Sequence, residues 1–276
     1  MKRIAVCFSG QSRTWNYCKE NIMRFFNITH MGIDPVEVDF FFHTWDTNTY
    51  RDHIIGTDFY SEFREEPADC SNMAEYFKPK KYEIENFNQF KSTRNTMYPF
   101  LPMTAWESMY HSYKKSINFK RNYELENDFE YDLVIKARFD CVYNPVHPFI
   151  AYPAESWKLY SSRIITKIAA EFPGNFDEAI FFGESKILDL LAFTGDAHLK
   201  NRINSLDSVH KFNPDPEIFD GPGSMLFRHM TRMNIIPDYH YQKFNYFVAR
   251  RHVVETGLCP INDWDKVVSS CQDWYR

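Results

Sequence analysis

Residues 132–140 read DLVIKARFD, and this stretch indicates how the chain folds. The apolar run at 133–135 is typical of a buried strand, and it leads directly into Arg138 and Asp140. Because open α/β sheets bind ligands beyond the carboxyl ends of their strands, both side chains are expected at a ligand site. The acid suits a cation and the arginine suits phosphate oxygens, although a strand ending in a surface ion pair explains the same residues.

Outward from this stretch, apolar runs alternate with helical patterns along the chain. We expect strands at 4–8, 36–42, 81–86, 133–137, 157–161, 178–182 and 239–249. We expect helices at 15–26, 103–123, 185–193 and 217–233, while 47–80 is expected to be irregular apart from weak helical patches near Tyr60 and Met73. This order predicts one α/β domain over 1–276, with a mostly parallel, Rossmann-like sheet flanked by helices and a less regular part after residue 145.

The composition limits the class of protein. With 44% hydrophobic residues the chain supports a sizeable core, and 18% aromatic residues suit a cleft that binds sugars or bases. A net charge of −5 argues against nucleic acid as a partner. The chain shows no signal peptide, no apolar run of the roughly 20 residues that a membrane span needs and no Cys-x-x-Cys pair. We therefore expect a soluble, cytoplasmic protein, and the scattered histidines predict no metal site.

The first expected strand stops at residues 9–14, which read SGQSRT. This turn has one glycine, and it lacks the Gly-x-Gly-x-x-Gly of a dinucleotide fold and the lysine of a P-loop. It nevertheless offers a close backbone approach, hydrogen-bonding groups and a positive charge for phosphate. These features belong to Ser9, Gly10, Gln11, Arg13 and Thr14. A glycine turn with a solvated arginine explains them equally well.

The second expected strand closes with residues 43–46, HTWD, which the switch-point rule places beside the first turn. Trp45 would stack on a base or sugar there, and His43 and Asp46 would bond hydroxyls. Alternatively, Trp45 seals the end of the sheet and Asp46 caps a helix.

Two acids, Asp177 and Glu178, come directly before another apolar run. Adjacent residues point to opposite faces of a strand, so at most one of them faces a cleft. That carboxylate would suit a general base acting on an acceptor hydroxyl. A capped, solvated strand start is the alternative.

Taken in order, these segments resemble a group of viral and bacterial sugar-transfer proteins, the glycosyltransferases of lipopolysaccharide and capsule synthesis. The resemblance covers roughly residues 3–235. It rests on the segments 8–14, 38–46 and 131–140, the helix ending at 123–124, the segment 176–183 and the helix beginning at 216–217.

The resemblance implies a GT-A-like fold, a nucleotide-sugar donor, a glycan or glycoprotein acceptor and a divalent cation, Mn²⁺ or Mg²⁺. Many such enzymes carry Asp-x-Asp where this chain has Arg138-Phe139-Asp140, so only the last acid is present to hold a metal. Residues 1–145 would bind the nucleotide sugar and 146–276 the acceptor. Asp177, with Glu178 as the alternative, would be the catalytic base.

Two other functions remain open. One is a carbohydrate- or nucleotide-binding module that has the same fold without catalysis, which the missing first acid favours. The other is a different nucleotide-using α/β enzyme, such as a kinase or a sulfotransferase, against which the absence of a P-loop counts.

Overall fold

The computed structural model describes residues 1–26, 35–50, 64–101, 103, 105–143, 158–161, 179–207, 222–239 and 246–248. Its centre is a seven-stranded sheet in the order β10-β8-β9-β6-β1-β2-β5. The strands are β1 Lys2–Ser9, β2 Val36–Trp45, β5 Lys81–Glu85, β6 Leu133–Ala137, β8 Lys158–Ser161, β9 Phe181–Gly183 and β10 Ile236–Tyr239. Among these described strands, β9 alone runs antiparallel to its neighbours. The predicted mostly parallel, Rossmann-like sheet is therefore confirmed.

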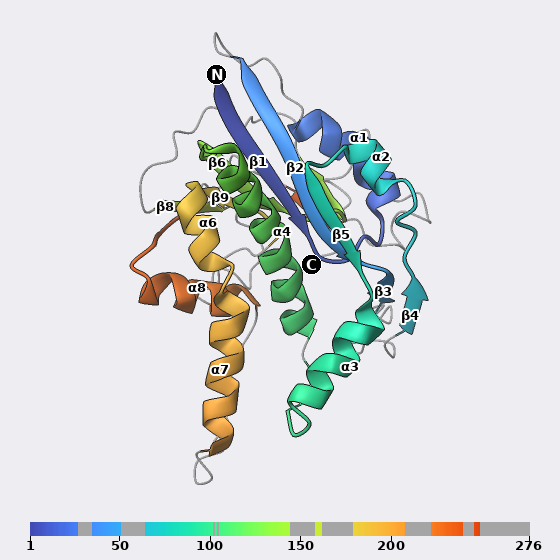
Figure 1. Cartoon of the computed structure of the whole chain (residues 1–276), viewed down its shortest axis with the longest axis vertical. Helices are drawn as coiled ribbons and strands as arrows, with labels where there is room; N and C mark the ends of the chain where they lie inside the picture. The colour runs from blue at the N-terminus through green and yellow to red at the C-terminus, as the bar shows by residue number, and fades with distance from the viewer. Residues whose placement is uncertain are drawn as a thin grey trace, which may run out of the picture.

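Helices cover both faces of this sheet (Figure 1). α1 (Trp15–Phe26) and α2 (Met73–Phe77) pack on one face, and α4 (Ala105–Asn127), α6 (Ser185–Leu191) and α8 (Pro222–Arg232) pack on the other. α3 (Phe87–Met97) follows β5, and α7 (Thr194–Asp207) packs along α4. Two small antiparallel pairs complete the described fold: β3 (Thr47–Tyr50) with β4 (Arg64–Pro67), and β7 (Cys141–Tyr143) with β11 (Tyr246–Val248).

The apolar run of β1 explains why the sheet is covered twice. Alternate side chains of a strand point to opposite faces. Ile4, Val6 and Phe8 belong to the core beneath α1, whereas Ala5 and Cys7 belong to the core beneath α4. All five are at most 2% exposed. A strand buried on both faces has no polar alternation, which is typical of a parallel sheet between helical layers.

Two buried ionic clusters fix the long helix α4 in place. Lys120, fully buried, donates to Glu124 and Asp189 at 2.8 and 2.7 Å and also contacts Ser185, which ties α4 to α6. Near the start of α4, Arg94 of α3 makes a two-pronged ion pair with Glu107, at 2.6 and 3.0 Å. Buried charges need such partners because the interior solvates them poorly. These pairs hold α3, α4 and α6 in register.

Several sequence predictions need correction. Within 47–80, which was expected to be irregular, β3 and β4 form a strand pair, whereas α2 confirms the helical patch near Met73 and the patch near Tyr60 lies outside the described residues. α3 and α7 were not predicted, because neither has a strong apolar stripe; α3 is held instead by Phe87 and Phe90 against Trp45. Of the strand expected at 239–249, the described residues are Tyr239, which ends β10 beside β8, and 246–248, which form β11 beside β7. Of the helix expected at 217–233, the described residues form α8 from Pro222, which suits the first position of a helix.

Candidate functional site

The turn after β1 leaves open space beside its backbone. Gly10 has a φ of +105°, which favours glycine, and a Cβ added there would meet no atom within 4 Å. Its N–H donates to the Ser112 hydroxyl of α4 at 2.7 Å. The turn is thus held from one side by α4 and is open to a close ligand approach on another.

The rest of the turn is anchored to β3. The Gln11 side chain accepts from the Thr49 backbone N–H at 3.1 Å and from Arg13 Nε at 2.9 Å. The Arg13 backbone N–H donates to Asn48 Oδ1 at 3.0 Å, and Arg13 has a positive φ of 31°. A non-glycine residue in this region costs conformational energy, which the surrounding hydrogen bonds must offset. The arginine is therefore held in a defined position.

Two further residues of the predicted site are buried at the ends of this turn. Ser9 is 2% exposed, and its hydroxyl has no hydrogen-bond partner among the described residues. Thr14 is equally buried, and its carbonyl accepts from the N–H groups of Tyr17 and Cys18, which begins α1.

Asp140 is the centre of a three-residue ionic cluster. It follows β6, the neighbour of β1 in the sheet, and its side chain is only 2% exposed. Arg138 donates to both carboxylate oxygens, Nε to Oδ1 at 2.8 Å and Nη2 to Oδ2 at 2.7 Å. Arg13 Nη1 reaches Oδ2 at 3.3 Å from the turn after β1. One buried carboxylate thus holds two partly exposed guanidinium groups together.

A buried tyrosine supports this cluster from behind. The Tyr143 hydroxyl accepts from the Arg138 backbone N–H at 3.0 Å and donates to the Arg138 carbonyl at 2.8 Å. Asn21 of α1 bonds both backbone groups of Tyr143. Burial raises the pKa of Tyr143 well above its usual range, so the hydroxyl stays neutral and can play both roles.

A second polar cluster lies on the α4 face of the sheet. His43 Nε2 and His111 Nε2 contact the same Glu85 oxygen, Oε2, at 2.8 and 2.9 Å. His43 Nδ1 lies 2.9 Å from the Ser112 hydroxyl that also binds Gly10. The three side chains come from β2, α4 and β5, and their ligand atoms all lie within 4.8 Å of one another. The cluster could hold a metal ion, which the spacing of the histidines did not predict.

Trp45 and Asp46 adopt the arrangement of the sealing alternative. Trp45 is 1% exposed and packs against Phe87, Phe90 and His111 at the end of the sheet. Asp46 Oδ1 accepts from the Phe87 backbone N–H at 3.0 Å, at the first turn of α3. The described contacts therefore give both residues a packing and capping role.

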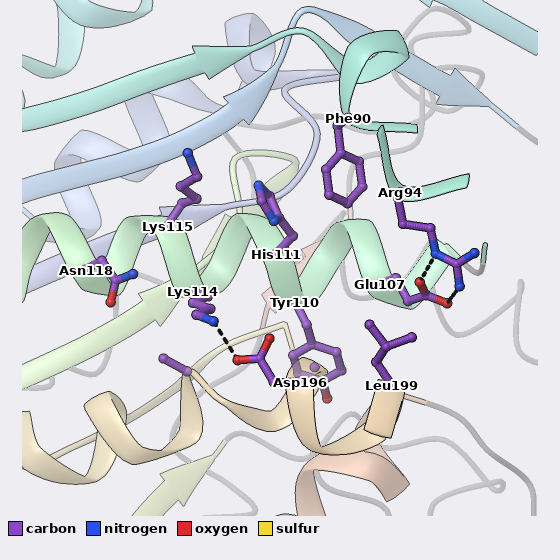
Figure 2. A pocket seen from close by; sticks show the side chains of 12 residues that line it. Phe90, Arg94, Glu107, Tyr110, His111, Lys114, Lys115, Asn118, Asp196 and Leu199 are labelled. Carbon is purple, nitrogen blue, oxygen red and sulfur yellow. Dashed lines mark hydrogen bonds and ion pairs between the residues drawn. The ribbon is translucent and has the colours of Figure 1, made fainter. Parts of the chain in front are cut away.

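A cavity of about 330 Å³ opens between α3, α4 and α7, and His111 and Lys115 are among the residues that line it. Figure 2 shows Tyr110 and Asp196 facing this space, with Arg94 and Glu107 at one end. None of the nine described residues of the predicted donor site lines it. This cavity is therefore separate from the Gly10 turn.

The structure brings together Gly10, Gln11, Arg13, Arg138 and Asp140, and it links His43 to this group through Ser112. Asp177 and Glu178 lie outside the described residues.

Five polar residues of this region were not predicted from the sequence, because they come from elements that are distant along the chain and meet only through tertiary packing. They are Asn48, Glu85, His111, Ser112 and Tyr143. The only local sequence pattern that pointed to any of them is the four-residue spacing of His111 and Lys115, which places both on one side of α4.

No family model and no curated protein matches the chain. Among solved structures, the chain is similar to the crystal structure of a glycosyltransferase involved in the glycosylation of the major capsid of PBCV-1. The TM-score is 0.39 at 9% identity, over 87% of this chain and 82% of that one. This similarity is too weak to assign an activity. In the part of the chain that the structure describes, no helix has the length and apolarity to cross a membrane.

Proposed function

We propose that the protein is a glycosyltransferase that moves a sugar from a nucleotide-diphosphate donor to a hydroxyl acceptor on a glycan. One observation carries this proposal: two guanidinium groups converge on Asp140 beside the open Gly10 turn, where β1 and β6 end. In an open α/β sheet, this edge is where ligands bind. Because the chain has a net charge of −5, a diphosphate needs such local cations.

Arg13 and Arg138 would act on the leaving group. As the bond from the sugar to the diphosphate breaks, negative charge develops on the departing phosphate oxygens. Guanidinium groups already oriented toward that position stabilise the charge without reorganising during the reaction. Asp140 keeps the two arginines together before the donor arrives, and Gly10 lets the diphosphate approach the backbone.

The arrangement at Asp140 does not suit a divalent cation. Both carboxylate oxygens already accept from guanidinium groups, and a cation would have to displace at least one of them next to two positive charges. We therefore derive no catalytic step through a metal at Asp140. The two arginines supply the charge that a cation would otherwise contribute.

The acceptor side stays a prediction from the sequence. We propose that residues 146–276 bind the acceptor, and that Asp177, with Glu178 as the alternative, removes the proton from its hydroxyl. An inverting reaction needs such a base within about 2.6–3.2 Å of that hydroxyl. Asp177→Asn should keep donor affinity and lose transfer if Asp177 is the base, and Glu178→Gln should do the same if Glu178 is the base. Normal transfer by both variants would exclude this role for the pair.

Donor binding tests the arginines directly. Calorimetry with uridine and guanosine diphosphates, and with their sugar conjugates, would compare Arg13→Gln and Arg138→Gln with the wild type. Loss of a charge-assisted contact costs roughly 1.5–3 kcal/mol, which is about a ten- to hundredfold weaker affinity. Arg24→Gln is the control, since this arginine is exposed on α1 and should not matter. Equal affinities in all four proteins would remove the basis of the proposal.

A binding module without catalysis is the second candidate. The same cluster favours it, because Arg138 stands at the position of the first acid of Asp-x-Asp. Turnover separates the two. An enzyme releases free sugar or transfers it when incubated with its donor, whereas a binding module binds the donor and leaves it intact.

A further inference from the structure

The cluster of His43, Glu85 and His111 joins three elements at one point. Glu85 is the last residue of β5, His43 lies near the end of β2, and His111 projects from α4. Figure 2 shows His111 and Lys115 on the same side of α4. The His43 side chain is fully buried, while Glu85 and His111 are 23% and 29% exposed. The cluster thus has a rigid interior ligand and two others that solutes can reach.

The Ser112 hydroxyl determines how the protons are arranged. It accepts from the Gly10 N–H at 2.7 Å, and it lies 3.0 Å from the His43 carbonyl and 2.9 Å from His43 Nδ1. Its one proton can serve only one of these two acceptors. If it is donated to the carbonyl, Nδ1 must carry a hydrogen. His43 Nε2 then lies 2.8 Å from the Glu85 carboxylate, and either a second ring proton or a bound metal ion joins the two groups.

We propose that His43, Glu85 and His111 form a binding site for a transition-metal dication of the Zn²⁺ class, which shares His43 with the predicted donor site. The proposal does not depend on the glycosyltransferase assignment, because Glu85 and His111 are not predicted donor residues and metal binding is tested without nucleotide.

The ligand set determines which ion would bind. Two imidazole nitrogens and one carboxylate oxygen suit Zn²⁺ and its neighbours, whereas Mg²⁺ and Ca²⁺ prefer oxygen alone. Ligands about 2.0–2.2 Å from a tetrahedral zinc lie roughly 3.3 Å apart. The nitrogen-to-oxygen distances of 2.8 and 2.9 Å therefore need to widen by about half an ångström, which the partly exposed Glu85 and His111 can accommodate. Three protein ligands leave a fourth position for water.

The surrounding charges are compatible with a dication. Lys115 lies 3.8 Å from Glu85 and 3.1 Å from Glu83. A bound cation would repel this ammonium, which has Glu83 as its nearer partner.

The Ser112 hydroxyl links the proposed metal site to the turn after β1. A ligating histidine donates its other ring N–H to a fixed acceptor, and the Ser112 hydroxyl is in position to be that acceptor for His43. The same hydroxyl holds Gly10. A bound ion would therefore connect the ends of β2 and β5 to α4, and through Ser112 to the Gly10 turn.

The test is metal titration of the full chain after treatment with a chelator. Zn²⁺ is titrated calorimetrically in excess Mg²⁺, and Co²⁺ binding is followed by its visible spectrum. We expect one saturable site whose affinity falls at least about tenfold in His111→Gln and in Glu85→Gln. Ser112→Ala should weaken Zn²⁺ binding by about 10–100-fold, because the Ser112 hydroxyl orients the His43 ring. His229→Gln is the matched control, since this half-buried histidine of α8 contacts the Leu190 carbonyl at 3.3 Å.

Circular dichroism of each variant shows whether it is folded. If His111→Gln does not fold, Glu85→Gln is the variant that tests the site. Three outcomes would overturn the proposal: no saturable Zn²⁺ binding in the wild type, unchanged affinity in both ligand variants, or a thiolate-to-cobalt charge-transfer band, which would place the ion on cysteines.

Discussion

Neutralising Asp140 separates the two roles that this residue has been given, a holder of two arginines or a ligand of a metal. Asp140→Asn keeps one acceptor oxygen, but it places an amide N–H₂ group against a guanidinium and leaves two positive charges without their shared counter-ion. Two contacts to Arg138, at 2.8 and 2.7 Å, are strong, and the one to Arg13, at 3.3 Å, is weaker. A hydrogen bond to a charged group contributes about 1.5–3 kcal/mol.

Because both arginines are about one-fifth exposed, water compensates part of this loss, and we expect a destabilisation of about 2–3 kcal/mol. Thermal denaturation should show a decrease in Tm of roughly 4–12 °C. Asp132→Asn, at the start of the same strand, is the control. Its carboxylate accepts only an exposed backbone N–H in the described contacts, so its Tm should change little. An unchanged Tm in Asp140→Asn would refute the ionic cluster.

The same variant also tests the chemistry. In chelator, Asp140→Asn should bind nucleoside diphosphates more tightly than the wild type, because the carboxylate no longer competes with phosphate for the two guanidinium groups. Transfer should nevertheless decrease, since the arginines lose their orientation. If affinity instead falls, and falls only when Mn²⁺ is present, Asp140 is a metal ligand and the arginine mechanism is wrong.

Three further predictions concern stability. Lys120→Met leaves the buried Glu124 and the partly buried Asp189 without their ammonium partner and should lower the free energy of unfolding by about 3–5 kcal/mol in urea denaturation. Arg94→Leu removes both hydrogen bonds to the buried Glu107 and should cost about 3 kcal/mol or more, whereas Arg64→Leu, at an exposed pair, should cost less than about 1 kcal/mol in the same thermal assay. Gly10→Ala should cost about 1–2 kcal/mol through backbone strain alone, since its Cβ meets no neighbour, and an unchanged stability would contradict the +105° φ.

The central strands, most of the helices and the position of Gly10, Arg138 and Asp140 beyond two strand ends could be predicted from local sequence patterns. A continuous apolar run that ends in polar residues is a local pattern, and it located β1 and β6 with Gly10, Arg138 and Asp140 just beyond their ends. The helical spacing at 105–123 likewise predicted most of α4. These features depend on which side chains are buried, and buried apolar residues recur along the sequence with the period of the strand or helix that carries them.

Which polar residues come into contact depends on the tertiary structure. Arg13 and Asp140 are 127 residues apart, and they come together because β1 and β6 are neighbours in the sheet. The cluster of His43, Glu85 and His111 needs β2 paired with β5 and α4 packed across them. Strand order and helix packing follow from the combined free energy of the whole core rather than from local periodicity. The same reason explains α3, which has little apolar pattern of its own and is held by contacts with Trp45.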